Sequence, residues 1–322
     1  MNRALSPKFM DDLQNEDGML FPLLEWIRND DTLLLAIRKN YINVYYRGGN
    51  ILKLKQMPQN QYEASFYVGG YAKDCPDFFP VPKNPDSLIN SKTDIKHWIE
   101  SFPDRKQVMD FYFNKTKNAE REFQQLVVRE NTLSGISNKT DYFIADIELA
   151  FSDSRFDMLA FKWLADKVIR KKGNVQLSLI EMKYGDDAFG YGDRGDDSGI
   201  VDHYEKMQKF LEKQSSELVE MAENQINQLN KLELIKHTRG IKREFIVDKD
   251  RFEIVFLFAN HNPRSEILIR ELELLKSKLT ETTKKLIDLR FFVASSSGYA
   301  LNNACMMSIE EYMAFLRSRN PS

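Results

Sequence analysis

Two carboxylates and an ammonium group lie in two strand-like runs, and their types and spacing are the ones in this chain best suited to chemistry. The first run contains Asp157, and the second closes with Glu181 and Lys183. Side chains alternate between the two faces of a strand, so Glu181 and Lys183 share one face while Met182 points to the other. Burying such charges without partners is costly. A divalent metal ion is one partner that would make the arrangement favourable.

The oxygen ligands indicate which metal this would be. Carboxylate oxygens suit Mg²⁺ or Mn²⁺, which retain water ligands and also bind phosphate oxygens. A lysine two residues after the glutamate could reach a metal-bound water, or a phosphoryl oxygen on which negative charge develops. The alternative is structural: Asp157 and Glu181 would then only form ion pairs, with Arg155 and Lys183 as their partners.

Three strand-like runs in succession should position these side chains. They cover residues 142–149, 155–161 and 175–183, and we expect them to pair as an antiparallel meander. A basic segment separates the second run from the third. Its Lys171 and Lys172 could bind a phosphate backbone, although a solvated hairpin loop is the simpler explanation.

A helix is predicted on each side of the three runs. Residues 118–130 have helical periodicity, and Glu120 lies on the buried edge of the apolar face, although its spacing also fits a solvated glutamate. A long helix is expected from about residue 200 to 235. His203 and Lys206 in its first turns could meet phosphate near the helix amino terminus, while an ordinary surface or packing role is the alternative for the histidine.

The long helix raises the question of a second subunit, because its apolar positions could form a homodimer or be covered by the chain itself. Between Lys183 and this helix, residues 184–198 hold four glycines and five aspartates, which predicts a flexible flap rather than a calcium loop. The remaining segments predict a buried strand over 252–258, a helix over 265–286, a strand over 289–294, and a last helix opened by the capping-box spacing of Ser308 and Glu311.

The amino-terminal third has a different character. One helix is expected within residues 1–29, and four short β-rich runs between Leu33 and Val68 predict a small antiparallel meander with a hairpin at Gly48. The proline-rich stretch 75–92 should be a loop. Basic and aromatic residues of the meander could form a nucleic-acid surface, with ordinary exposed sheet residues as the alternative: Arg38, Lys39, Tyr41, Tyr45, Tyr46 and Arg47.

Length and composition limit the possible classes. At 322 residues the chain is long for one core, so we expect a β-rich domain over 1–115 and a second domain over 116–322. The formal net charge of −2 gives no overall basic signature, so any nucleic-acid contact must be local. Two distant cysteines suit a reducing compartment, and we find no signal peptide or membrane-spanning run. A cytoplasmic protein is expected.

The order helix, strand, strand, strand, helix, strand, with an acid on the first helix and the Asp and Glu-x-Lys residues on the later strands, resembles the PD-(D/E)XK nuclease superfamily over roughly residues 116–260. The resemblance implies that Asp157 and Glu181 bind Mg²⁺ or Mn²⁺, that the backbone carbonyl of Met182 can add a ligand, and that Lys183 orients or activates the attacking water. Phe156 stands where the family name has its proline.

The same resemblance suggests a further acid. The run Glu-Arg-Glu-Phe beginning at Glu120 is similar to the first-helix motif of archaeal Holliday-junction resolvases within the superfamily, which makes Glu120 the candidate and leaves Glu122 and Glu148 as rivals. The fold implied is α/β with a mixed sheet, a restriction-endonuclease-like αβββαβ core, and a small amino-terminal β-rich domain. The activity implied is metal-dependent endonucleolytic cleavage of phosphodiester bonds, with DNA as the first candidate substrate and the choice between DNA and RNA left open. A non-catalytic protein that uses this fold as a nucleic-acid-binding or assembly scaffold is the alternative.

Overall fold

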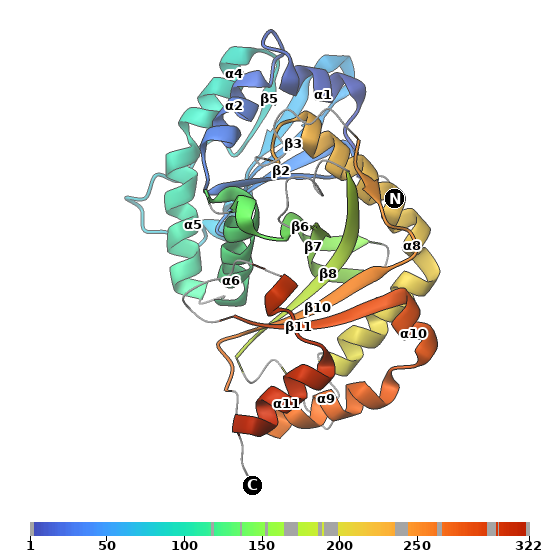
Figure 1. The fold of residues 1–322 in the computed structure, drawn as a ribbon. Coiled ribbons are helices and arrows are strands. Elements are labelled where there is room, and N and C mark those ends of the chain that lie inside the picture. The colour runs from blue at the N-terminus through green and yellow to red at the C-terminus, as the bar shows by residue number, and fades with distance from the viewer. Residues whose placement is uncertain are drawn as a thin grey trace. The chain divides into compact units, whose positions relative to one another are not determined.

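The chain folds as a mixed α/β structure with two sheets, seen in a computed structural model (Figure 1). Contacts divide it into two compact units: the first comprises Met1–Gln125, Leu133–Gly135 and Met221–Ile241, and the second comprises Leu126–Thr132, Ile136–Glu220 and Lys242–Ser322. The structure describes residues 3–116, 119–135, 137–151, 154–163, 173–185, 189, 199–235, 244–262, 266–294, 301 and 303–319.

The first unit is built on the predicted meander, which has one more strand than expected. Its five strands are antiparallel and pair in chain order. Arg47 and Gly48 connect the second strand to the third and both have positive φ, 50° and 80°, as tight hairpin turns require. The fifth strand lies within the stretch predicted to be a proline-rich loop. The strands are β1 (Leu33–Ile37), β2 (Tyr41–Tyr46), β3 (Gly49–Gln56), β4 (Tyr62–Ser65) and β5 (Asp86–Ile89).

Two helices replace the single one expected at the amino terminus. The chain turns back between them at Gly18, where a Cβ would lie 2.5 Å from the carbonyl oxygen of Asp12, so only glycine fits this close approach. Ser6 caps the first helix by accepting a hydrogen bond from Phe9 N. The helices that begin in this part of the chain are α1 (Pro7–Gln14), α2 (Phe21–Asn29), α3 (Val68–Tyr71), α4 (Lys92–Glu100), α5 (Phe102–Thr116) and α6 (Ala119–Val128).

The second unit contains the sheet that carries the candidate site. Its first three strands form the expected antiparallel meander, and two further strands join in parallel, in the order β11-β10-β8-β7-β6. Every residue of β10 is buried, as its apolar sequence predicts. The strands are β6 (Tyr142–Phe151), β7 (Ser154–Lys162), β8 (Asn174–Tyr184), β9 (Ile246–Val247), which pairs with β8, β10 (Phe252–Ala259) and β11 (Ile287–Ala294).

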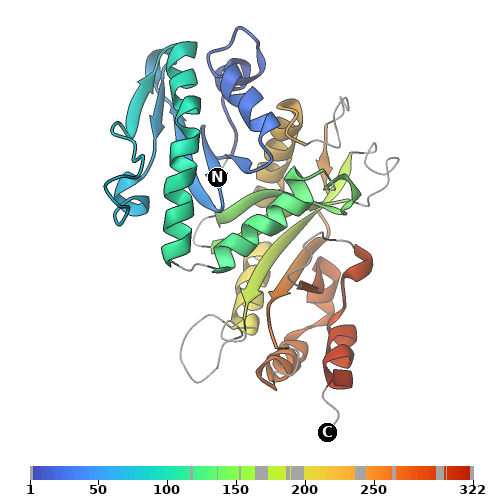
Figure 2. The ribbon, with the colours of Figure 1, turned by 90° about the vertical axis from the view of Figure 1, so that its left-hand side faces the viewer.

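The helices of this part include the long one, whose amino-terminal section belongs to the second unit. Phe210 packs on Phe156 with ring centroids 4.8 Å apart, and Tyr312 stacks on Phe258 at 5.5 Å. Figure 2 shows α9 (Glu266–Lys278) and α11 (Ile309–Arg319) beside each other near the carboxyl terminus. The helices are α8 (Ile200–Lys231), α9 (Glu266–Lys278), α10 (Glu281–Leu286) and α11 (Ile309–Arg319).

Capping explains why the stretch predicted as one helix over 265–286 is two. Thr280 begins α10 with a capping box, in which the Thr280 hydroxyl accepts from Thr283 N and the Thr283 hydroxyl accepts from Thr280 N. This box requires an extended backbone at Thr280, which interrupts the helix. The box predicted at Ser308 is also present, because Ser308 N donates to Glu311 and Glu311 N donates to Ser308.

The apolar positions of α8 are buried within the chain, including Tyr204, Phe210, Leu211 and Leu218. The stripe that suggested a homodimer therefore has a partner in the chain's own core. None of the helices in the described part of the chain is long and apolar enough to span a membrane. Apart from residues 184, 185 and 189, the stretch predicted to be a flap lies outside the described residues, as do Lys171 and Lys172.

Candidate active site

The candidate site lies where the ladder between β7 and β8 ends. Met158 pairs with Ile180 as the last register, so Asp157 and Glu181 follow directly after it. Strand β8 continues along β10 through Lys183, which keeps its backbone in the sheet. Asp157 Oδ2 accepts a hydrogen bond of 2.8 Å from the backbone N–H of Met182. The Asp157 carboxylate is thereby fixed beside the Glu-x-Lys segment.

Glu181 is the most enclosed charge of the group. Its side chain is 6% exposed, and Oε1 accepts a hydrogen bond from Lys183 Nζ at 2.9 Å and lies 2.8 Å from His203 Nδ1. Burial by itself would raise the pKa of Glu181, but the hydrogen bond from His203 and the positive charge of Lys183 outweigh it and hold the pKa below its ordinary value. The carboxylate is therefore ionised at neutral pH, as a metal ligand must be.

The ion pairs expected under the structural alternative are observed in part. Glu181 pairs with Lys183, whose side chain is itself 8% exposed. Arg155 pairs instead with Glu148 of β6. The lysine is therefore held by the glutamate two residues before it, while Asp157 has a backbone donor from β8.

These residues fit a hard divalent ion with a small number of protein ligands. Within the described residues no cluster of three or more His, Cys, Asp or Glu side chains could hold a metal. Mg²⁺ is commonly bound through one or two carboxylates, with water and substrate phosphate completing its shell. Asp157 and Glu181 supply that number, and both contacts of Glu181 use Oε1, so Oε2 is the oxygen an ion would bind. The Met182 N–H donates to Asp157. The Met182 carbonyl is the further ligand that the resemblance implies.

The extra acid is the least determined of the predicted residues. Glu120 is half-buried in the first turn of α6, in the first unit, whereas Asp157 and Glu181 lie in the second. Its rivals both have cationic partners: Glu122 pairs with Arg47, and Glu148 pairs with Arg155.

Besides Glu148, which lies opposite Asp157 in register, β6 carries an acid near the site that the sequence analysis did not consider. Asp146 of β6 is fully buried and pairs with Leu159, two residues along β7 from Asp157, next to an irregularity in the ladder. Its signal in the sequence was a carboxylate at an alternating position of an apolar strand. Asp146 is therefore a further candidate for the acid beside Asp157.

The predicted phosphate contacts are distributed differently from expectation. His203 Nδ1 contacts Glu181, so the imidazole belongs to the candidate site itself and only Nε2 could face a phosphate. Lys206 is exposed one turn further along α8. In the first unit, Arg38 and Tyr45 are buried and hydrogen-bonded to each other, and Arg47 pairs with Asp110, so these residues of the predicted basic surface serve the sheet.

A second buried polar group was not predicted. Glu253 of β10 is fully buried, with Tyr142 Oη donating to Oε1 at 3.2 Å, Ser178 Oγ donating to Oε2 at 2.6 Å, and Lys162 as its ion-pair partner. Burial and the negative charge of Glu253 both raise the pKa of Tyr142. These residues come from four neighbouring strands, so the group ties the sheet together and has a structural role.

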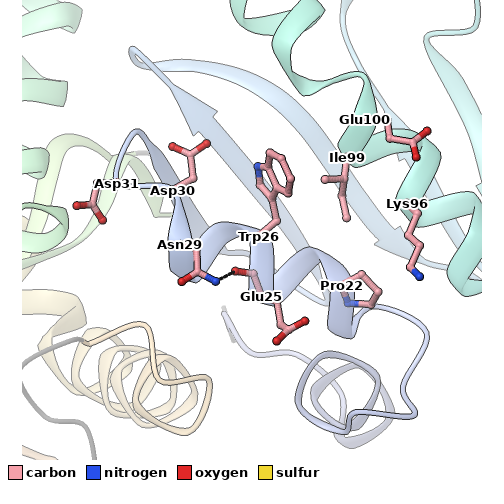
Figure 3. Close-up of a pocket in the computed structure, with 9 residues that line it drawn as sticks. All are labelled: Pro22, Glu25, Trp26, Asn29, Asp30, Asp31, Lys96, Ile99 and Glu100. Carbon is pink, nitrogen blue, oxygen red and sulfur yellow. Dashed lines mark hydrogen bonds between the residues drawn. The ribbon is translucent and has the colours of Figure 1, made fainter.

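A hollow in the first unit was also not predicted (Figure 3). Figure 3 shows Trp26 rising from α2 toward it, and Trp26 is 43% exposed. Four carboxylates and one lysine line it, which gives a formal charge of 1 − 4 = −3, so a phosphate backbone would be repelled. These five residues are Glu25, Asp30, Asp31, Glu100 and Lys96.

Comparisons with known proteins identify no relative: no protein-family model matches the chain, and neither do curated proteins or solved structures.

Proposed function

We propose that this chain is a metal-dependent nuclease, in the first place a DNA endonuclease, that hydrolyses phosphodiester bonds with Mg²⁺ or Mn²⁺. The observation that supports this most is the group at the end of β8, where Asp157 is bonded to Met182 N–H and Glu181 is buried against Lys183. Two carboxylates beside a held lysine suit binding of a hard metal and of a phosphate together.

The finer assignment of the fold rests on topology. Helix α6, strands β6, β7 and β8, helix α8 and strand β10 follow one another in the order that the PD-(D/E)XK resemblance requires. Strand β10 is parallel to β8 at the centre of the sheet. The Glu-x-Lys residues, Glu181 and Lys183, lie at the carboxyl end of β8. We infer a restriction-endonuclease-like core on this basis.

Each residue has a distinct role in the proposed reaction. The metal, when bound, polarises the phosphate and lowers the pKa of water. Asp157 and Glu181 provide its carboxylate ligands. Lys183 orients the attacking water or stabilises the charge that develops on the phosphoryl oxygens. Water adds its oxygen to phosphorus and releases one proton to solvent, the bond to the leaving oxygen breaks, and that oxygen takes up a proton from solvent. His203 is a positioning residue that fixes Glu181.

Cleavage assays test the proposal directly. Plasmid, linear and branched DNA and RNA are incubated with wild type, Asp157→Asn and Lys183→Met, in Mg²⁺, Mn²⁺ or chelator. Glu273→Gln is the matched control, because it removes a carboxylate of α9 that pairs with Arg317 at the surface, outside the candidate site. We expect metal-dependent cutting by wild type and control, and a loss of about 100-fold or more in both site variants. Cutting that survives in folded Asp157→Asn would contradict the assignment.

A non-catalytic scaffold is the second candidate, and one observation favours it. The Glu181 carboxylate already has Lys183 and His203 as partners, so its charge is balanced without a metal. Under this alternative wild type neither cuts nor binds a divalent ion, and the site variants lose only stability.

A substitution series can identify the further acid. Asp146→Asn and Glu120→Gln are compared in the same assay, with circular dichroism to establish folding. Loss of cutting in only one of them assigns the role to that residue.

A further inference from the structure

The first unit contains a buried arginine whose charge has no partner in the described part of the chain. Arg105 of α5 is 3% exposed, and its Nε and Nη1 atoms are buried without a hydrogen-bond acceptor. Its guanidinium lies 3.5 Å from the ring centroid of Trp98 and 5.5 Å from that of Phe66. The aromatic faces offset part of the charge but leave the N–H donors unused.

This arrangement is costly unless an anion completes it. Burial lowers the pKa of Arg105 to about 9, against the opposing influence of neighbouring Asp104, and the group is still charged at neutral pH. A buried charge without a partner is destabilising, and the planar guanidinium is the side chain best shaped to bind an oxyanion. Buried donors without an acceptor require an explanation, and a bound anion is one that fits a guanidinium.

Arg105 lines a hollow that supplies more donors. The hollow measures about 420 Å³, within the range of small-molecule sites. Lys83 and Arg105 against Asp94 give a formal charge of 2 − 1 = +1 with His97 neutral. Asp94 is occupied at the start of α4, where it accepts from Asn90 N at 2.9 Å. Hydrogen-bonding groups on the wall include Asn84, Ser87 and His97, while the Ser101 hydroxyl donates to the backbone carbonyl of Trp98.

We propose that this hollow is an anion site that binds the phosphate group of a small phosphorylated molecule. Arg105 is the buried anchor, while the exposed Lys83 and His97 meet the anion at the rim. A phosphate monoester carries close to two negative charges and three acceptor oxygens, which matches one buried guanidinium with cationic and hydroxyl donors around it better than a singly charged carboxylate does. The site is independent of the proposed nuclease chemistry.

Calorimetry and thermal unfolding test this on the full chain. Inorganic phosphate, ribose 5-phosphate and acetate are titrated into wild type, Arg105→Met and Lys83→Ala at constant ionic strength. Lys53→Ala is the control, because Lys53 lies over Tyr41 on the sheet, apart from the hollow's lining. We expect saturable binding of phosphate and its ester by wild type and Lys53→Ala, and about tenfold or more weaker binding by Arg105→Met. Preference between phosphate and its ester identifies the source of the anion.

Three results would overturn the proposal. One is the absence of saturable phosphate binding to wild type. Another is equal binding of acetate. The third is an equal rise of the unfolding midpoint in wild type and Arg105→Met, which is the general salting effect of phosphate. Without anion, Arg105→Met should unfold at the same or a higher temperature than wild type, since it removes an unpaired buried charge. If that variant does not fold, weaker binding by Lys83→Ala than by Lys53→Ala decides the question.

Discussion

Met182 donates its backbone N–H to Oδ2 of Asp157 over 2.8 Å, and this bond spans two strands after their regular ladder has ended. A sheet that loses its ladder leaves backbone donors without partners, and here a carboxylate supplies the acceptor. The same bond holds Asp157 beside the strand that carries Glu181 and Lys183. One interaction therefore serves both the sheet and the candidate site, and substitutions at Asp157 can separate the two.

Asp157→Asn should fold normally and lose function. The amide oxygen can still accept from Met182 N–H, so we expect a loss in the free energy of unfolding under about 1 kcal/mol. Asp157→Ala leaves the donor unpaired and should cost about 1–3 kcal/mol. Urea denaturation measures both values, and cleavage should be lost in both variants. Equal destabilisation by Asn and Ala would mean that the hydrogen bond contributes nothing.

The pH at which the protein begins to lose stability in acid should depend on His203. Because the pKa of folded Glu181 lies below its ordinary 4.5, the stabilisation from its ionised form is present above pH 4.5 and is lost as the pH falls through the folded value. His203→Ala removes the strongest contribution that lowers this pKa, so burial should raise it and the loss should begin at higher pH. NMR titration of the Glu181 carboxyl in metal-free protein measures the change.

His203→Asn is the matched control for that titration, because its amide nitrogen can occupy the position of Nδ1. It should keep the pKa of Glu181 close to the wild-type value. An unchanged pKa in His203→Ala would show that the 2.8 Å contact does not hold in solution.

Much of the sheet was predictable from the sequence, because its strands alternate or are continuously apolar. The meander β6-β7-β8 and the buried strand β10 follow from these patterns, and the capping box at Ser308 follows from spacing. The positions of Asp157, Glu181 and Lys183 along their strands could be predicted for the same reason. Contacts between separate helices and strands could not be predicted in this way.

The link from Glu181 to His203 illustrates this limit. It joins a strand to a helix across the stretch 185–199, and no local periodicity encodes such a contact. Arg105 did have a signal: it lies three residues after Phe102 and four before Met109, on the buried face of α5. A charge on an apolar helix face indicates a special environment, although its aromatic partners come from other elements.

The Glu253 group provides a stability prediction in the same sheet, outside the candidate site. Lys162→Met leaves a fully buried carboxylate without its countercharge, and should cost about 3–5 kcal/mol. Adding Glu253→Gln should recover most of that loss, since Tyr142 and Ser178 then face a neutral acceptor. Urea denaturation of the two single variants and the double variant measures the coupling.

The surface pair of Glu148 and Arg155 is the control for this cycle. Arg155 is 70% exposed, so its removal should cost under about 1 kcal/mol. A loss at Lys162 as small as that at Arg155 would show that water reaches the Glu253 group.

Lys183→Met should affect metal binding and catalysis in opposite directions. Lys183 Nζ lies 2.9 Å from Oε1 of Glu181, and the positive charge of the lysine repels a cation that approaches the same carboxylate. Removing that charge should tighten Mg²⁺ or Mn²⁺ binding by about tenfold, and enlarge the metal-induced rise of the unfolding midpoint. Cutting should nevertheless be lost, because the group that orients water or stabilises the phosphoryl charge is absent. Calorimetry with each metal measures the affinity, chelator should reverse the thermal shift, and Asp157→Asn should lack it. If Lys183 serves only as a structural partner of Glu181, the variant would lose stability and gain no affinity for metal.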